Sequence, residues 1–172
     1  RNISNKLIEL IKQVPVVTII GLRQSGKTTL VKKSFPEYNY VNLEDPVNRM
    51  LAKEDYRGFF ETYKEPVIID EVQRVPELLS AIQVMVDEDR EKNGRFILTG
   101  SHQPSLQRGI AQSLAGRAGI LTLLPLSMNE LAEEGLLEDL STDKLLLKGF
   151  MPELYREGTR EAIVYYRDYL NT

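Results

Sequence analysis

The stretch that decides the fold is VVTIIGLRQSGKTTL, residues 16–30. Its first five residues are apolar or β-branched, which is typical of a strand buried on both faces. A glycine-rich turn follows, and then a helix-forming segment over residues 27–34. The spacing G-x-x-x-x-G-K-[ST] of the Walker A motif is matched by Gly21, Gly26, Lys27 and Thr28. Because a strand precedes the motif and a helix follows it, we predict a phosphate-binding loop rather than an ordinary turn.

The residue types in this loop suit a nucleoside triphosphate with Mg²⁺. Glycine lets the backbone fold so that successive N–H groups point at phosphate oxygens, and the positive end of the following helix faces the same anion. Lys27 is predicted to reach the outer phosphates, and the Thr28 hydroxyl to bind Mg²⁺. The residues expected to contact the nucleotide are Gly21, Leu22, Arg23, Gln24, Ser25, Gly26, Lys27, Thr28 and Thr29.

Beyond the loop, apolar runs alternate with segments of helical period, which is the pattern of an α/β fold with a parallel sheet. The predicted strands are residues 16–20, 38–43, 66–69, 95–99 and 118–124. From residue 136 onward only helical signals are found. We therefore expect one core over residues 1–135 and a helical segment over residues 136–172, the start of a lid or of a linker.

Three helix starts carry local signals. Asp45 is suited to cap a helix whose first residue is Pro46, and Pro76 is suited to open the next one. Ser127 and Glu130 have the spacing of a capping box, in which each side chain bonds the backbone of the other.

A second motif, PVIIDEVQ over residues 66–73, ends a buried strand with two carboxylates. Asp70 is placed to hold the Mg²⁺ shell beside the phosphate loop, and Glu71 to orient and polarise a water against the terminal phosphate. The simpler interpretation is that both acids cap the turn into the next helix. A water-activating glutamate favours hydrolysis over transfer to an acceptor hydroxyl.

Two further stretches, FILTGSHQ and SLAGRAGILTL, offer polar candidates. Thr99, Ser101 and His102 follow apolar residues at the carboxyl end of a strand, where ligands bind in such sheets. Thr99 or Ser101 is a candidate hydrogen-bond partner of the γ-phosphate or the attacking water, and ordinary turn chemistry is the alternative. Arg117 is a candidate to read the γ-phosphate in the same chain or to complete a site in trans; a surface ion pair is the alternative.

The composition excludes several classes of site. The 172 residues carry a formal net charge of −3, which gives no electrostatic case for nucleic-acid binding. Cysteine is absent, which excludes disulfides and thiolate metal sites, and the one histidine, His102, argues against a histidine metal site or a catalytic triad. No apolar run approaches the ~20 residues of a membrane helix, and no secretory signal is found, so we expect a cytoplasmic protein. The chain begins at Arg1 and stops within a helical pattern, which suggests a fragment.

Taken together, the motifs resemble the AAA-type ATPase domain of a family of predicted prokaryotic ATPases. The resemblance implies a P-loop NTPase three-layer sandwich, with a five-stranded parallel sheet of order 5-1-4-3-2 and a helical C-terminal tail. It also implies that Asp70 is the Walker B acid, Glu71 the catalytic glutamate and Arg117 the arginine finger, and that adenine is preferred to guanine. Members of this family usually continue into a nuclease-like domain. The stretches that carry the resemblance are GLRQSGKTTL, VIIDEVQRVPELLSAIQ, FILTGSHQPSL, SLAGRAGILTLLPLSMNEL and GFMPELYREG.

The functional hypothesis is an ATPase that binds ATP with Mg²⁺, hydrolyses it slowly, and uses nucleotide state to control a C-terminal domain or a protein partner. Two alternatives stay open at this stage. One is a nucleotide-gated switch with negligible turnover, and the other, less favoured, is a small P-loop kinase. Assembly into an oligomer is left open by the sequence.

Overall fold

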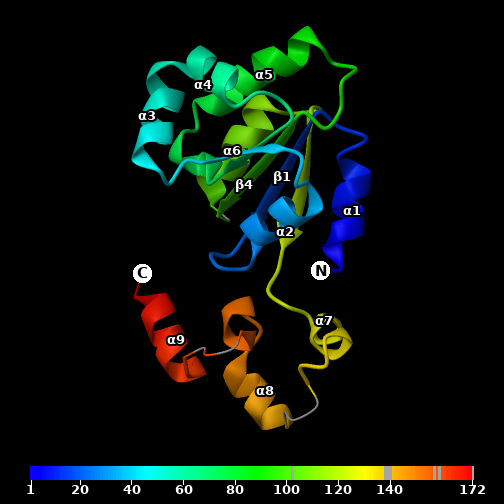
Figure 1. The fold of residues 1–172 in the computed structure, drawn as a ribbon, viewed down its shortest axis with the longest axis vertical. Helices are drawn as coiled ribbons and strands as arrows, with labels where there is room; N and C mark the ends of the chain where they lie inside the picture. The colour runs from blue at the N-terminus through cyan, green and yellow to red at the C-terminus, as the bar shows by residue number, and fades with distance from the viewer. Residues whose placement is uncertain (102, 138–140, 157, 159, 172) are drawn as a thin grey trace.

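The computed structural model describes residues 1–101, 103–137, 141–156, 158 and 160–171. A five-stranded parallel sheet lies between two layers of helices, and a smaller group of helices lies below it (Figure 1). The strand order is β2-β3-β4-β1-β5, which is the expected order 5-1-4-3-2 read from the other edge. The predicted α/β class, the three-layer P-loop NTPase architecture and the helical tail are confirmed.

The strands follow the predicted apolar runs with small shifts at their ends. Every residue of β1, β3 and β4 is buried, which explains their continuous apolar character, whereas β2 and β5 are partly exposed at the two edges of the sheet. Strand β4 extends two residues past the predicted end because its pairing with β1 continues as far as Gly21 opposite Ser101. The strand bounds are β1 (Val16–Gly21), β2 (Asn39–Asn42), β3 (Val67–Asp70), β4 (Phe96–Ser101) and β5 (Ala118–Leu123).

The local helix signals are largely confirmed. Asp45 caps a helix that begins at Pro46, and the capping box of Ser127 and Glu130 is present. The helix predicted from Pro76 begins two residues later, because the chain there first makes 3-10-type hydrogen bonds between residues three apart. The helices are α1 (Ile3–Leu10), α2 (Lys27–Ser34), α3 (Pro46–Glu54), α4 (Tyr56–Thr62), α5 (Leu78–Glu88), α6 (Pro104–Ser113), α7 (Met128–Glu133), α8 (Thr142–Lys148) and α9 (Ala162–Leu170), with 3-10 turns η1 (Val72–Arg74) and η2 (Pro152–Tyr155).

The core has two parts, one on each face of the sheet. Helices α3 to α6 pack on one face, where Phe59 of α4 and Ile82 of α5 are fully buried. Helices α1 and α2 cover the other face through Leu7 and Val31. Burial of large aliphatic and aromatic side chains on both faces stabilises the sheet and fixes where its strand ends lie.

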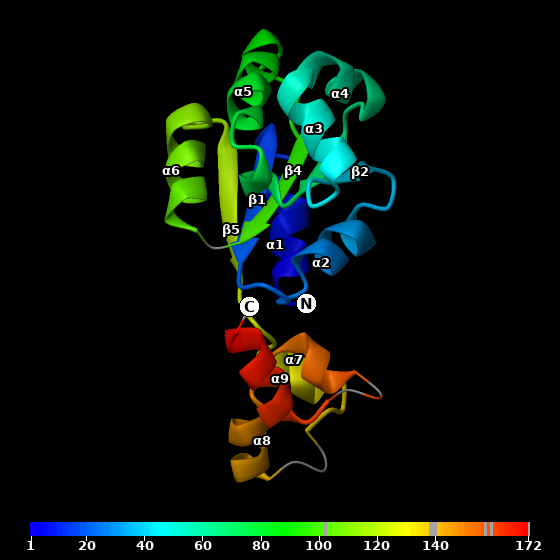
Figure 2. The same cartoon turned by 90° about the vertical axis from the view of Figure 1, so that its left-hand side faces the viewer.

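The tail forms a small unit of its own around Met151, Leu154 and Tyr165. In Figures 1 and 2 helix α7 lies with α8 and α9, below the end of the sheet where β1 leads into α2. The division into a core over residues 1–135 and a segment over residues 136–172 stays a prediction. In the described part of the chain, no helix has the length and apolar character needed to span a bilayer.

Candidate functional site

The loop between β1 and α2 needs glycine at two positions for two different reasons. At Gly21 a Cβ atom would lie 2.3 Å from the carbonyl oxygen of Leu123, so the close approach of β5 excludes any side chain. Gly26 has a φ of 91°, in the left-handed region that side chains disfavour. Gln24 adopts a φ of 59° although it is not glycine. The loop is therefore a tightly curved segment that delivers the chain to the N-terminus of α2.

Lys27 is the first residue of α2, and its ammonium group folds back over the loop. Its Nζ donates to the carbonyl oxygens of Gly21 at 3.2 Å and Leu22 at 2.8 Å, and the residue is 5% exposed. Burial lowers the pKa of Lys27, and the carboxylates of Glu71 and Asp70 oppose that shift. A positive charge is thus held within the curve of the loop, where an anion would lie.

Asp70 ends β3, and its buried carboxylate accepts hydrogen bonds from three hydroxyl groups, each on a different element. Its Oδ2 accepts from Thr28 Oγ1 and from the Tyr40 hydroxyl, each at 2.8 Å, and its Oδ1 accepts from Thr99 Oγ1. The structure therefore brings together Thr28 and Asp70, the two residues predicted to hold Mg²⁺. Thr99, predicted to act near the γ-phosphate, lies beside them.

Tyr40 of β2 was not a sequence candidate. Burial, followed by the hydrogen bond to Asp70, raises its pKa. Strand β2 pairs with β3, with Asn42 opposite Asp70 in register. The adjacency of these strands, which the family resemblance implied, is the signal that would have pointed to a polar side chain on β2.

Glu71 follows the end of β3 in an unusual backbone conformation. Its φ of 59° and ψ of 45° are left-handed, and its N–H donates to Thr99 Oγ1 at 3.3 Å. Its carboxylate accepts a hydrogen bond from Gln73 Nε2. A left-handed non-glycine residue costs about 1–3 kcal/mol, and such strain gathers at functional sites. Glu71 thus stands at the strand ends in a conformation that the surrounding contacts maintain.

Several buried polar atoms at these strand ends have no hydrogen-bond partner among the described residues. Ser25 Oγ, in the phosphate loop, and Ser101 Oγ, at the end of β4, are two of them. A third is Gln73 Oε1, whose neighbour in β4 is Gly100. Buried polar groups almost always have partners. The hydroxyl groups of Ser25 and Ser101, together with Lys27 and Asp70, form a donor and acceptor set that fits phosphate oxygens and a hydrated cation.

Arg117 lies at the opposite end of the sheet from the loop. It precedes β5, whose first residue is in register with Val16 at the start of β1. Its Nε and Nη2 donate to the two carboxylate oxygens of Asp87, each at 2.8 Å. Within one chain Arg117 does not reach the loop, so the prediction that it reads the γ-phosphate in cis is wrong. The ion pair that was its alternative is present, and a role in trans stays a prediction.

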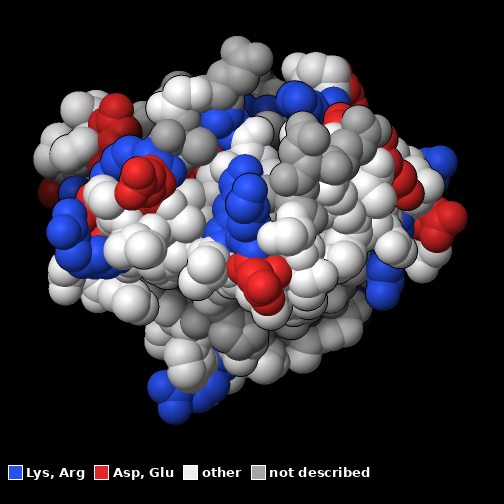
Figure 3. Space-filling model, turned by 90° about the horizontal axis from the view of Figure 1, so that it is seen from below, with Lys and Arg blue, Asp and Glu red and all other residues white. Residues whose placement is uncertain are grey.

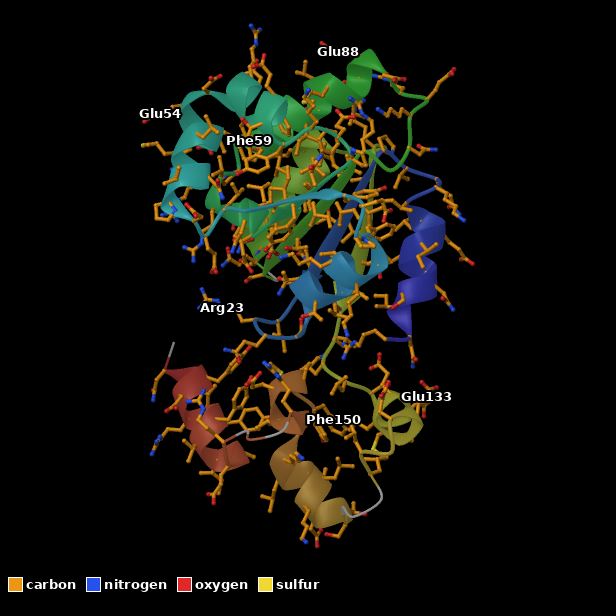
Figure 4. The ribbon with its side chains drawn as sticks, in the orientation of Figure 1. Arg23, Glu54, Phe59, Glu88, Glu133 and Phe150 are labelled. Carbon is orange, nitrogen blue, oxygen red and sulfur yellow. The ribbon has the colours of Figure 1, made fainter. Side chains whose placement is uncertain are left out.

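The remaining arginines of the loop, the turn after β3 and the tail are exposed or form ion pairs. Arg23 is exposed, and its side chain extends outward from the loop (Figure 4). Arg74 forms an ion pair with Glu44 at 3.7 Å. The three arginines among the described tail residues are all paired with tail carboxylates: Arg156 with Glu153, Arg160 with Asp168, and Arg167 with Asp168. His102 lies outside the described residues.

The tail contacts the loop directly. The hydroxyl of Tyr165, in α9, donates to Gln24 Oε1 at 2.7 Å, and that of Tyr169 donates to the carbonyl oxygen of Arg23 at 3.3 Å. Tyr165 is 2% exposed, and its burial raises its pKa. On the tail side of the molecule, basic and acidic side chains are interspersed (Figure 3). The sequence predicts a helical segment over residues 136–172 and gives neither tyrosine a role.

The comparison with family models decides the family. A model described as an AAA domain matches residues 13–132. The chain belongs to the AAA domain family. Two curated relatives of this AAA domain are an uncharacterised protein, Mb2031c, of Mycobacterium bovis and an uncharacterised protein, Rv2008c, of Mycobacterium tuberculosis. Each is 32% identical over 182 residues, and the match covers 100% of this chain and 38% of the relative. The chain thus spans less than two fifths of the length of these relatives.

Solved structures support the fold of this AAA domain. A Walker-type ATPase of Pyrococcus abyssi superposes with a TM-score of 0.62 at 18% identity, covering 99% of this chain and 71% of that one. DnaA of Aquifex aeolicus, bound to AMPPCP, superposes with a TM-score of 0.57 at 16% identity, and the match covers 90% of this chain and 57% of that one. A signal-transduction ATPase with a tetratricopeptide-repeat sensor from Pyrococcus horikoshii superposes with a TM-score of 0.54 at 20% identity. That match covers 98% of this chain and 32% of the other. The domain is a P-loop ATPase domain of the AAA type by family and fold.

Proposed function

We propose that this AAA domain binds ATP with Mg²⁺, hydrolyses it slowly, and passes its nucleotide state to the remainder of a longer protein or to a partner. The observation that supports this most is the gathering of five side chains at the carboxyl ends of three adjacent strands. Those side chains are Lys27, Thr28, Asp70, Glu71 and Thr99.

Binding is proposed to use the loop residues 21–29. The N–H groups of the curved segment and the N-terminus of α2 face the phosphates, and Lys27 exchanges its contacts with loop carbonyls for contacts with phosphate oxygens. Thr28 and Asp70 hold Mg²⁺. No group of three or more acidic, histidine or cysteine side chains that could hold a metal is found among the described residues. Water and phosphate oxygens would supply the remaining ligands, which is the usual arrangement for Mg²⁺.

Hydrolysis is proposed to begin from a water held by Glu71. The carboxylate accepts a proton as the water oxygen attacks the γ-phosphorus, and the bond from that phosphorus to the β-phosphate oxygen breaks to give ADP and phosphate. Thr99 stands between Asp70 and Glu71, so it ties the Asp70 carboxylate and the Glu71 backbone N–H to β4. Bound Mg²⁺ supplies neutralisation of charge on the phosphate oxygens.

Transmission of nucleotide state is proposed to run through the tail. Tyr165 and Tyr169 bond the same loop that would surround the phosphates, so a change in the loop alters two contacts of α9. Residues 136–172 are then a lid or linker between the core and the rest of the protein. The greater length of the mycobacterial relatives supports the existence of such a further part.

The test is phosphate release from ATP and from GTP with Mg²⁺, using the wild type, Lys27→Ala and Glu71→Gln over a range of protein concentrations. ATP-dependent release that both substitutions abolish is the expected result. Release with GTP equal to that with ATP would contradict the proposed adenine preference. A specific rate that rises with concentration would indicate an arginine supplied in trans, for which Arg117 is the candidate. Tight ATP binding without release would contradict hydrolysis and leave the nucleotide-gated switch.

A further inference from the structure

Gln73 lies in the turn η1, two residues beyond Glu71, and its amide nitrogen donates back to Glu71 Oε2. The backbone of this turn is fixed by neighbours on both sides. Val72 and Val75 are fully buried, and the N–H of Arg74 donates to the carbonyl oxygen of Glu71 at 3.0 Å. The side chain of Gln73 therefore starts from a rigid position, and its reach to Glu71 does not depend on a mobile loop.

The orientation of the Gln73 amide follows from chemistry. A carboxylate only accepts hydrogen bonds, so the amide nitrogen must face Glu71 and the amide oxygen must face the other way. That oxygen is buried against β4, where a Cβ atom at Gly100 would lie 2.6 Å from it. Gly100 does not have the positive φ that favours glycine. Its lack of a side chain instead leaves room for the Gln73 amide and for Leu106, whose Cδ2 would lie 2.4 Å from the same Cβ.

We propose that Gln73 is a positioning residue for ATP hydrolysis, which holds the Glu71 carboxylate in the orientation that accepts the proton of the attacking water. The inference rests on the proposed function, because it assigns Glu71 the role of base. Hydrogen bonds to a charged acceptor are short and strong, and the one from Gln73 engages Oε2. The second oxygen, Oε1, is then held in a defined direction for the water. Gln73 acts through Glu71 and touches no reacting atom.

The test compares Gln73→Met, which keeps the length of the side chain and removes the donor, with Gln73→Glu, which keeps its shape and repels Glu71. Gln112→Met, at an exposed position in α6, is the matched control. We expect kcat for ATP to fall about tenfold in Gln73→Met and further in Gln73→Glu, a fraction of the effect of a general base. The KM for ATP and the affinity for a non-hydrolysable ATP analogue should stay within about twofold of wild type.

A double substitution separates positioning from a structural role. In single-turnover measurements with enzyme in excess, Glu71→Gln and Glu71→Gln/Gln73→Met should have the same residual rate, because Gln73 has no carboxylate left to orient. A further loss in the double variant, or lost ATP affinity in Gln73→Met, would overturn the inference. An unchanged or raised kcat in Gln73→Met, with Glu71→Gln still inactive, would also overturn it. That result would leave the proposed ATP hydrolysis in place. A wild type that binds ATP without hydrolysing it would overturn both.

Discussion

The hydroxyl of Tyr165 bonds the side chain of Gln24 at 2.7 Å, across 141 residues of sequence. The bond joins the tail to a loop residue that is held in a left-handed conformation. Tyr165→Phe removes the hydroxyl and keeps the ring. A neutral hydrogen bond contributes about 1 kcal/mol, so ATP affinity should fall about fivefold and amide exchange in α9 should accelerate by a similar factor.

Tyr155→Phe is the matched control for this prediction. Its hydroxyl donates to the carbonyl oxygen of Gly149 at 2.7 Å, within the tail. It should accelerate exchange in the tail without changing ATP affinity. Equal nucleotide affinities for wild type, Tyr165→Phe and Tyr155→Phe would show that the tail contact does not reach the binding step.

Asp70→Asn should make nucleotide binding insensitive to Mg²⁺. The neutral amide binds a divalent cation far more weakly than the carboxylate, while the loop proposed to contact the phosphates is left in place. Titration of a fluorescent ATP analogue with Mg²⁺ and with EDTA measures the effect. For wild type we expect affinity at least about tenfold higher with Mg²⁺. An Asp70→Asn variant that retains this difference would place the cation elsewhere.

Gly21→Ala and Gly26→Ala should both destabilise the fold, for different reasons and to different extents. At Gly21 the added methyl overlaps a backbone carbonyl of β5, and overpacking of this kind costs about 1–3 kcal/mol. At Gly26 an added Cβ would meet no atom within 4 Å beyond its own chain neighbours, so only the left-handed φ is penalised, by about 1 kcal/mol. Denaturant unfolding at neutral pH measures both. A larger loss at Gly26 than at Gly21 would contradict the close approach of β5.

The ion pair between Arg117 and Asp87 should contribute stability that disappears in acid. The hydrogen bond from Arg117 holds the pKa of Asp87 below its usual value, with Arg90 as a further cationic neighbour. A depressed folded-state pKa gives stability that is present above the unfolded value, near 4, and is lost as pH falls through the folded-state value. Arg117→Gln should therefore lower the denaturant midpoint at pH 7 and leave it nearly unchanged below about pH 3. A difference that persists at low pH would mean that packing, rather than charge, is lost.

Features with a local cause were predictable from the sequence. The loop motif is recognised by its spacing and by the strand and helix on either side of it. Asp45 and Ser127 cap backbone N–H groups within a few residues, so both caps can be predicted without knowing the fold. The interpretation that Arg117 reads the γ-phosphate in the same chain could have been rejected from the sequence. A residue just before a parallel strand lies at the amino edge of the sheet, whereas the loop after Gly21 lies at the carboxyl edge.

Features that depend on distant contacts were not predictable. The bond from Tyr40 to Asp70 requires the neighbour and register of β2, and the bond from Tyr165 to Gln24 requires the docking of α9. The role of Gly100 becomes visible only when Gln73 is seen against it. In each case a polar side chain is ordinary in its own segment and acquires meaning from a partner far along the chain.

The hydroxyls of Tyr40 and Thr28 share a single oxygen atom of Asp70. Strand β2 is the outermost strand on its side of the sheet, and it contributes no residue to the loop. Its Asn42 carbonyl accepts a hydrogen bond from Asn48 of α3 at 3.2 Å. A cation bound at Asp70 would compete with the two hydroxyls for one set of lone pairs. The edge strand and helix α3 are consequently joined to Asp70 by two hydrogen bonds and the backbone of β2 between them. An ion at the proposed Asp70 site would therefore have a mechanical path to a surface remote from the loop.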